Sequence, residues 1–301
     1  PRAAREMGPE TEEGQEQHRA ARDLYRPTVR FGVVAMFVSA IVLVISGDFQ
    51  AQIMFKQQPM KMASAEALCE TETGASFSIL TIGGPDAFAE QCGDVTHLIE
   101  VPYVTSFLAT HTFDATLQGV DDLNAQYKEE FGETATNIHG EEVEVDYRPN
   151  LFVTYWSFRL MMGLAAFSGI LALWALWVTR GKGENARTTG SKAFQWFAVL
   201  AIPMPFLANS AGWVFTEIGR QPWVVHPNPD DPTVRLMTLQ GVSAHPSWMV
   251  LASLVAFTLV YGVLAVIWFR MMQKAALKGA PLPQRDPETE ELDTPTLSFD
   301  Y

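Results

Sequence analysis

Residues 193–223 read AFQWFAVLAIPMPFLANSAGWVFTEIGRQPW, and this stretch decides the class of fold. Its apolar part, from Ala193 to Phe215, is long enough to cross a membrane as a helix, because about 20 residues span the hydrocarbon core. A carboxylate, a guanidinium, an amide and two indoles then fall within the eleven residues from Trp213 to Trp223. Ionisable groups at the edge of a membrane span are energetically costly and tend to mark function.

The charged end of this stretch allows two interpretations. Glu217 and Arg220 are three residues apart, so they can form an ion pair on one face of a helix, and such pairs are often structural only. Trp213 and Trp223 fit the aromatic belt that membrane proteins place at the interface. A belt accounts for the tryptophans, but it does not account for a carboxylate beside a guanidinium at this depth.

Four apolar runs of membrane-spanning length occur along the 301 residues, of which 48% are hydrophobic. A soluble protein can bury one such helix, but four exceed an ordinary core. The sequence therefore predicts an all-α membrane protein with four transmembrane helices and a long external loop between the first and second. In chain order, the predicted segments are a cytoplasmic polar segment 1–28, a transmembrane helix 29–47, an external loop 48–150, a transmembrane helix 151–179, a cytoplasmic loop 180–192, a transmembrane helix 193–216, an external segment 217–245, a transmembrane helix 246–271 and a disordered cytoplasmic tail 272–301.

The orientation follows from the basic residues of the short loops, which tend to stay in the cytoplasm. The loop 180–192 carries four Lys or Arg residues against Glu184 alone, and three more basic residues follow the last span. Both segments are therefore predicted to be cytoplasmic, which places 48–150 and 217–245 outside. The loop 48–150 carries 18 Asp or Glu against 4 Lys or Arg, as an external loop can.

Composition also excludes several classes of protein. The formal net charge of −13 argues against nucleic-acid binding, which needs a basic face. Two cysteines without a CxxC motif argue against a thiolate zinc site. The chain begins at Pro1 in a polar run that has no secretory-signal pattern, and this start is typical of a truncated sequence.

Two further blocks carry candidate chemistry. Residues 58–68 read QPMKMASAEAL, with good helix formers after the proline. Lys61 and Glu66 are five residues apart and do not form an i,i+4 pair, so each is free to face something else, and a solvated amphipathic helix is the plain alternative. Residues 155–163 read YWSFRLMMG and place Arg159 inside a hydrophobic helix, where it must have a partner.

The third span carries Pro203 and Pro205, which kink or break a helix unless neighbours satisfy the freed carbonyls. Asn209 and Ser210 add polar groups further along the same span. This composition favours a helix that lines a cofactor rather than lipid.

Taken together, the blocks 58–68, 155–163 and 212–223 resemble, in their order, subunit I of the cytochrome bd-type quinol oxidases. The resemblance extends from about residue 29 to residue 271. It implies that Lys61 and Glu66 bind or position the quinol, with Glu66 as a general base and Lys61 holding it ionised or binding a quinone oxygen.

The resemblance also implies a set of haem-site residues. Met161 corresponds to an axial ligand of a low-spin haem b, a role that thioethers commonly fill, and a shift of one residue would select Met162 instead. Glu217 corresponds to an iron ligand at the high-spin haem site. Arg159 is expected beside the haems, with a haem propionate or Glu217 as its partner. The remaining expected cofactor-binding residues are Arg220, Trp213, Gln221 and Trp223.

The implied cofactors are a low-spin haem b, a high-spin haem b and haem d, and the implied substrate is ubiquinol or menaquinol. None of the six histidines lies inside the four predicted spans. The resemblance therefore implies partners: N-terminal helices of subunit I that carry the remaining haem ligands, subunit II and small accessory membrane subunits. The expected place is the bacterial cytoplasmic (inner) membrane, in contact with the lipid bilayer, and this part of the subunit alone is expected to be inactive.

The implied reaction is oxidation of quinol at the outer face with reduction of dioxygen to water, which generates a proton gradient without pumping. An alternative is a non-catalytic membrane transporter or a ligand-binding subunit with a large external loop. That alternative explains the spans, the prolines and Arg159. It gives no reason for three blocks to match one family in the right order.

The two cysteines, Cys69 and Cys92, both fall in the predicted external loop. An external bacterial compartment is oxidising, which favours a disulfide between them. Two unrelated buried thiols are the alternative.

Overall fold

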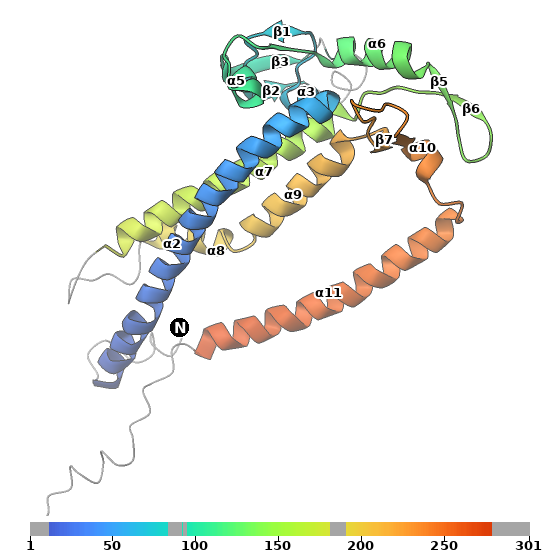
Figure 1. Cartoon of the computed structure of the whole chain (residues 1–301). Helices are drawn as coiled ribbons and strands as arrows, with labels where there is room; N and C mark the ends of the chain where they lie inside the picture. The colour runs from blue at the N-terminus through green and yellow to red at the C-terminus, as the bar shows by residue number, and fades with distance from the viewer. Residues whose placement is uncertain (1–11, 84–91, 93–94, 181–190, 279–301) are drawn as a thin grey trace, which may run out of the picture. The chain divides into compact units, whose positions relative to one another are not determined.

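The computed structural model describes residues 12–83, 92, 95–180 and 191–278 (Figure 1). Within these residues, four stretches of helix are long and apolar enough to cross a membrane. They are α2 (Glu12–Gln57), α7 (Leu151–Val178), α8 (Lys192–Leu200) together with α9 (Met204–Gly219), and α11 (Ser247–Lys278). The predicted fold class, a helical membrane protein with four spans and a long segment between the first and second, is confirmed.

Two helices extend beyond the predicted spans. Helix α2 begins at Glu12, so most of the segment predicted as a polar tail is helical. Helix α11 continues to Lys278, so residues 272–278 were wrongly assigned to a disordered tail. Those seven residues, MQKAALK, are good helix formers, and adding residues to an existing helix needs no new nucleus. The rest of the predicted tail, 279–301, lies outside the described residues, as do 1–11 and most of the loop 180–192.

The third span is broken where the prolines predicted a kink or a break. Helix α8 ends at Leu200, and α9 begins at Met204, directly after Pro203. Pro205 lies in the first turn of α9, where its missing N–H removes no helix bond. Ser191 caps α8, because its Oγ accepts a hydrogen bond from the Phe194 N–H at 3.2 Å.

The segments between α2 and α7 and between α9 and α11 fold into short elements, which we call the loop layer (Figure 1). Its described strands form four two-stranded antiparallel sheets, which the sequence did not predict. Before α7 the elements are α3 (Pro59–Glu66), β1 (Glu72–Thr73), β2 (Phe77–Ile82), β3 (Thr96–Val101), α5 (Val104–Thr110), β4 (Thr116–Leu117), α6 (Val120–Phe131), β5 (Thr134–Thr136) and β6 (Glu142–Glu144). After α9 they are β7 (Trp223–Val225), β8 (Leu236–Met237) and α10 (Thr238–Gly241).

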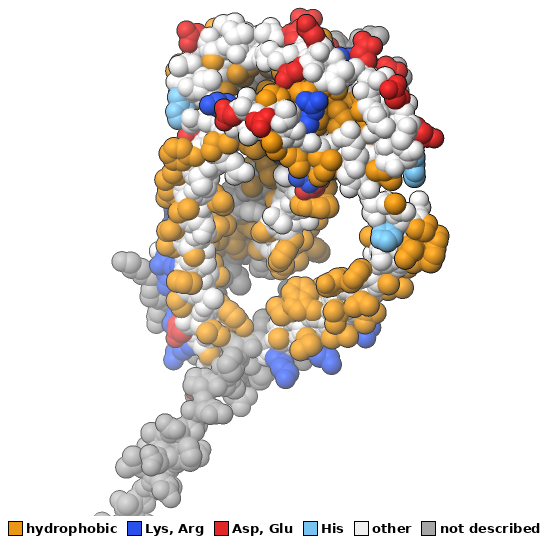
Figure 2. All heavy atoms as spheres, turned by 45° about the vertical axis from the view of Figure 1, so that its right-hand side comes forward, with side chains coloured by type: hydrophobic (Ala, Val, Ile, Leu, Met, Phe, Trp, Pro, Cys, Tyr) orange, Lys and Arg blue, Asp and Glu red, His pale blue; other side chains and the backbone are white. Residues whose placement is uncertain are grey.

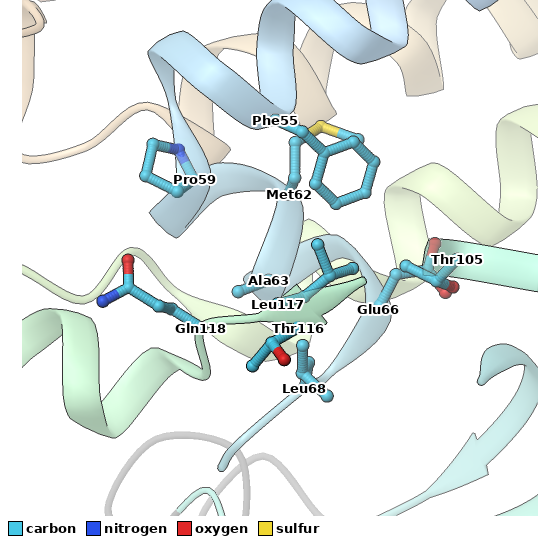
Figure 3. A pocket seen from close by; sticks show the side chains of 10 residues that line it. All are labelled: Phe55, Pro59, Met62, Ala63, Glu66, Leu68, Thr105, Thr116, Leu117 and Gln118. Atoms are coloured by element: carbon cyan, nitrogen blue, oxygen red, sulfur yellow. The ribbon is translucent and has the colours of Figure 1, made fainter. Parts of the chain in front are cut away.

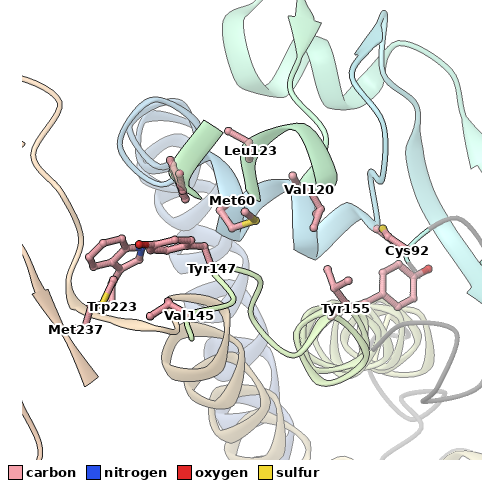
Figure 4. Packing of buried hydrophobic residues seen from close by; sticks show 13 residues of the cluster. Met60, Cys92, Val120, Leu123, Val145, Tyr147, Tyr155, Trp223 and Met237 are labelled. Carbon is pink, nitrogen blue, oxygen red and sulfur yellow. The ribbon is translucent and has the colours of Figure 1, made fainter. Parts of the chain in front are cut away.

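The main hydrophobic core lies in the loop layer rather than between the long helices (Figure 4). Tyr147 and Trp223 are stacked at its centre, with ring centroids 5.5 Å apart, and both are almost completely buried. The core also contains Met60 of α3 and Tyr155 of α7, so it ties the loop layer to the first turns of a membrane span. In contrast, apolar side chains on the long helices are largely exposed (Figure 2), as expected for surfaces that face lipid or partner helices.

Cys69 and Cys92, the pair predicted to form a disulfide, are joined in the structure, with Cα atoms 5.3 Å apart. The bond links the chain just after α3 to the segment just before β3. It therefore holds the end of α3 in place within the loop layer.

A separate compact unit contains the N-terminal part of α2 and the C-terminal end of α7. Within it, Arg26 and Arg30 donate hydrogen bonds to the Thr179 carbonyl oxygen, at 3.1 and 2.6 Å. Thr179 directly follows α7, and cations at a helix C-terminus are stabilising. The start of α2 and the end of α7 therefore lie beside each other within this unit.

Candidate functional site

Three elements meet at the candidate site: α3, the first turns of α7 and the last turns of α9. Gly219 of α9 lies where they touch, because a Cβ atom there would be 3.1 Å from Lys61 Cγ and 3.2 Å from Thr154 Cγ2. Both distances are shorter than an ordinary van der Waals contact. The glycine therefore allows α3 and α7 to pack closely against the end of α9.

Helix α3 is short, and both of its ends follow from the sequence. Pro59 occupies the first turn, where proline is favoured. Ala67 ends the helix in the left-handed conformation, with φ of 51°. Lys61 and Glu66 are both buried, and their spacing of five residues turns them roughly 140° apart around the helix axis. They accordingly face different neighbours.

Glu66 pairs with Arg159 of α7. The Arg159 Nη2 donates to Glu66 Oε2 at 2.6 Å, and the two side chains are 7% and 5% exposed. The Ser78 backbone N–H donates to the same oxygen at 3.2 Å. Within the described residues Arg159 therefore pairs with Glu66 and not with Glu217, because α3 of the loop layer lies against α7.

Three aromatic rings surround the Arg159 guanidinium. Its Cζ lies 4.6 Å from the ring centroid of Tyr155, 4.8 Å from that of Phe77 and 5.2 Å from that of Phe158. Such cation–π contacts strengthen when they are shielded from water. The cage fixes the guanidinium beside Glu66, and it is formed by β2 of the loop layer as well as by α7.

The pKa of the Glu66 carboxyl group is shifted towards neutrality. Burial raises its pKa to about 7, although Arg159 and the Ser78 N–H act in the opposite direction. A general base works best when its pKa is close to the operating pH. Glu66 therefore has the protonation behaviour expected of a base.

Glu66 also forms part of the wall of a cavity of about 140 Å³ (Figure 3). Figure 3 shows Phe55 of α2 against Met62 of α3, and Glu66 beside Thr105. The other residues around the cavity are Pro59, Ala63, Leu68, Thr116, Leu117 and Gln118. A cavity of about 150 Å³ is large enough to hold a benzene ring. The site can therefore take a small six-membered ring next to a carboxylate.

Lys61 lies on the other side of α3. Its Nζ is 5.0 Å from the centroid of the Phe215 ring, and the residue is 5% exposed. Its pKa is lowered by burial and by the nearby charge of Arg220, while Glu217 acts in the opposite direction. Lys61 is not among the residues that line the Glu66 cavity. The structure thus places the two predicted quinol residues in different surroundings.

Glu217 and Arg220 form an ion pair through Glu217 Oε2 and Arg220 Nη2, the i,i+3 pair that their spacing allows. Gln221 is held within the protein, because its Nε2 donates to the Glu217 carbonyl oxygen and its Oε1 accepts from the Thr238 hydroxyl. Glu217 and Arg220 remain partly exposed. The pair can therefore still meet a group from outside this chain.

Met161 points from α7 towards α9. A Cβ atom on Gly212 would lie 2.7 Å from the Met161 sulfur, so the thioether fits against the glycine. Trp213 is 66% exposed and faces away from the protein. Trp223, which is also predicted as a cofactor-binding residue, lies in the core of the loop layer against Tyr147.

The arrangement fits haem in one testable respect. Arg159 Nε and Nη1 and Arg220 Nε are buried N–H donors that have no hydrogen-bond partner within the described part of the chain. Haem propionates are anionic acceptors, which guanidinium groups bind well. Arg159 precedes the candidate ligand Met161 by two residues, and Arg220 follows the candidate ligand Glu217 by three. Each arginine that carries unpartnered donors thus lies within three positions, along the chain, of a predicted iron ligand.

Sequence reasoning missed several residues of this site. Tyr155 precedes Arg159 by four residues on one helix, so the helical period could have indicated their contact. Phe77 and Ser78 lie in a strand whose partner and register only the structure defines. No sequence signal connected that strand to Glu66.

Comparison with known proteins gives consistent results. The model of the family described as cytochrome bd terminal oxidase subunit I matches residues 14–280. The chain is 31% identical over 258 residues to cytochrome bd ubiquinol oxidase subunit 1 of Bacillus subtilis strain 168, with 85% of this chain and 49% of that protein covered. It is 25% identical to cytochrome bd-II ubiquinol oxidase subunit 1 of Escherichia coli strain K12, with 92% and 59% covered.

Among solved structures, the bd oxidase from Geobacillus thermodenitrificans has a similar fold, with a TM-score of 0.56 and 22% sequence identity. The similarity covers 84% of this chain and 50% of that chain. The chain thus spans about half the length of the relatives it matches.

Proposed function

The chain belongs to the cytochrome bd terminal oxidase subunit I family, and from this premise we propose that it oxidises quinol beside Glu66 within a terminal oxidase that reduces dioxygen to water. The observation that carries the proposal is the buried Glu66 carboxylate, which lies at the wall of a ring-sized cavity and is held by Arg159. The oxidase would work in the bacterial cytoplasmic membrane.

The proposed chemistry begins with the quinol ring in the cavity. Glu66 accepts a proton from a ring hydroxyl, which breaks the O–H bond and makes the ring oxygen easier to oxidise. Arg159 stabilises the carboxylate form of Glu66 through its charge-assisted hydrogen bond. A pKa of about 7 leaves a large share of Glu66 ionised and able to accept that proton at neutral pH.

We assign the residues that would hold haem in the same region. Met161 would ligate a low-spin haem b, and Glu217 would lie at a site for a high-spin haem b and haem d, with Arg159 and Arg220 available to the propionates. When bound, the haems accept electrons one at a time and carry them to dioxygen. Lys61 adds positive charge near Glu217, on the face of α3 that is turned towards α9.

The orientation of the spans would place the quinol cavity at the outer face. Basic residues lie at the start of α2, and Arg26 and Arg30 bind the end of α7, which supports a cytoplasmic location for that end. Protons from quinol would then leave outside, while those consumed in forming water come from inside, so a gradient arises without pumping. The proposed partners are the N-terminal helices of subunit I, subunit II and small accessory membrane subunits.

The alternative of a non-catalytic transporter or ligand-binding subunit rests only on the spans and the large loop layer. A visible spectrum separates it from an oxidase, because a transporter carries no haem. The sharper test replaces Glu66 with Gln in the complete oxidase. Losing a general base typically costs 10²–10⁴-fold in rate, so quinol oxidation should fall by about that factor while the haem spectra stay unchanged.

The matched control is Glu129→Gln, which alters an exposed carboxylate on α6. Its turnover should equal that of the unmodified oxidase. Unchanged quinol oxidation in Glu66→Gln would refute the role of Glu66 as the base.

A further inference from the structure

A network of polar side chains lies near Glu66, where the β2–β3 hairpin meets α7. The Ser78 and Thr81 hydroxyls are 2.5 Å apart, and the Thr81 hydroxyl lies 2.8 Å from His97 Nδ1. His97 Nδ1 in turn lies 3.4 Å from Glu100 Oε1. Ser78 and Thr81 are buried, whereas the side chains of His97 and Glu100 are 30% and 36% exposed. This polar network therefore extends from the protein interior to solvent.

A cleft of about 380 Å³ lies beside this polar network. Glu66, Ser78, His97 and Glu100 all contribute to its wall. A water molecule needs only about 10–15 Å³ of such volume, so the cleft has room for several. Glu66 thus borders two spaces: the ring-sized cavity and this cleft, which leads to His97.

We propose that the cleft is the exit route for the proton that Glu66 accepts, and that His97, assisted by Glu100, receives that proton and releases it to solvent. The proposal rests on the proposed function, because it needs quinol as the proton source. It adds a second proton-handling residue that lies 31 positions beyond Glu66 in the chain.

The proton balance is simple. Oxidation of one quinol releases two protons and two electrons, and Glu66 takes the protons one at a time. Each proton that leaves a quinol hydroxyl forms a new O–H bond with the Glu66 carboxylate, and the electrons leave towards the haems of the proposed oxidase. Glu66 then passes the proton through water in the cleft to a ring nitrogen of His97, and the Glu66 carboxylate is regenerated. Loss of the proton from His97 to bulk water restores the starting state.

The charges around His97 favour this direction. Glu100 lies on the same strand as His97. The neutral hydroxyls of Ser78 and Thr81 face His97 from β2, and the Tyr155 hydroxyl of α7 lies 3.1 Å from the Ser78 hydroxyl. Three further acidic residues, Glu66, Glu70 and Glu72, line the cleft beside neutral residues. No Lys or Arg is among the described residues that line it. An acidic cleft of this kind stabilises a transferred proton.

A purely structural role is the competing explanation. The Thr81 N–H donates to the Tyr155 hydroxyl oxygen at 2.7 Å, so the same network fastens the β2–β3 hairpin to α7. A fastening role predicts that loss of His97 loosens the hairpin and weakens quinol binding. A proton-transfer role predicts slower turnover that a mobile proton carrier restores.

The test replaces His97 with Ala in the complete oxidase and measures quinol oxidation in weak buffer, with His139→Ala, an exposed histidine elsewhere in the loop layer, as control. Turnover should fall by about tenfold, less than the 10²–10⁴-fold typical of losing the base itself. Added imidazole should restore it, and the solvent deuterium isotope effect should rise. The unmodified oxidase at the same imidazole concentration corrects for any effect of imidazole on the haems.

Unchanged turnover in His97→Ala would overturn the exit route, and so would a loss that appears only in KM and that imidazole does not restore. The Glu66→Gln variant separates this failure from failure of the proposed function. If Glu66→Gln slows quinol oxidation but His97→Ala does not, only the route is wrong. If neither variant slows it, the proposed function and the route fall together.

Discussion

Arg159 Nη2 lies 2.6 Å from Glu66 Oε2, and this contact joins the loop layer to the helix that carries Met161. The pair spans 93 positions of sequence. Because both side chains are buried, each is the main compensation for the charge of the other. The candidate base is therefore held by a side chain that lies two residues before the candidate haem ligand on the same helix.

The first prediction concerns Arg159. Removing one partner of a buried ion pair typically costs about 3–5 kcal/mol, because the other charge remains buried and uncompensated. Arg159→Met should therefore lower the thermal stability of the complete oxidase and shift the pH at which quinol oxidation reaches half its maximum to a higher value. Arg159→Lys, which keeps the charge, should show a smaller shift, and an unshifted pH profile in Arg159→Met would contradict the pairing.

The second prediction concerns pH. Burial raises the pKa of Glu66 from the ordinary 4.5 to about 7, so the folded protein holds this proton more tightly than the unfolded chain does. Its contribution to stability is present at low pH and is lost as the pH rises from about 4.5 to 7. Over the same range the base form appears, so quinol oxidation should increase with pH and level off above about 7.

Rate profiles between pH 5 and 9 test this expectation in the complete oxidase. Glu66→Gln should remove the inflection near 7 as well as most of the rate. An inflection that persists in Glu66→Gln would assign the titration to a different group.

The third prediction concerns Lys61, which was expected beside the quinol but faces α9 in the structure. Lys61→Met keeps most of the packing against Phe215 and Gly219 and removes a buried cation. Quinol oxidation should therefore change much less than in Glu66→Gln, whereas the spectrum of the haem assigned to Glu217 should shift. A loss of quinol oxidation as large as that of Glu66→Gln would show that Lys61 acts at the quinol cavity after all.

Long-range packing separates what could be predicted from what could not. Apolar length alone located the four spans, and the two prolines, Pro203 and Pro205, located the break in the third. The pairing of Glu66 with Arg159 could not be predicted, because nothing local relates two residues 93 positions apart. The sequence allowed Trp223 to be part of an interfacial belt for the same reason. Its burial depends on Tyr147, which belongs to a different segment of the loop layer.

The last prediction concerns the haem assignments and uses the contact between Met161 and Gly212. Met161→Leu removes the thioether, so in the complete oxidase the low-spin haem signal should be lost or become high-spin. Gly212→Ala keeps the thioether but puts a methyl group 2.7 Å from its sulfur. The Met161 side chain must then move, so the same signal should weaken or shift. Met162→Leu is the matched control and should leave the signal unchanged. Glu217→Ala should disturb the oxygen-reacting haems and preserve the low-spin signal. A normal low-spin spectrum in Met161→Leu together with its loss in Met162→Leu would move the ligand by one residue.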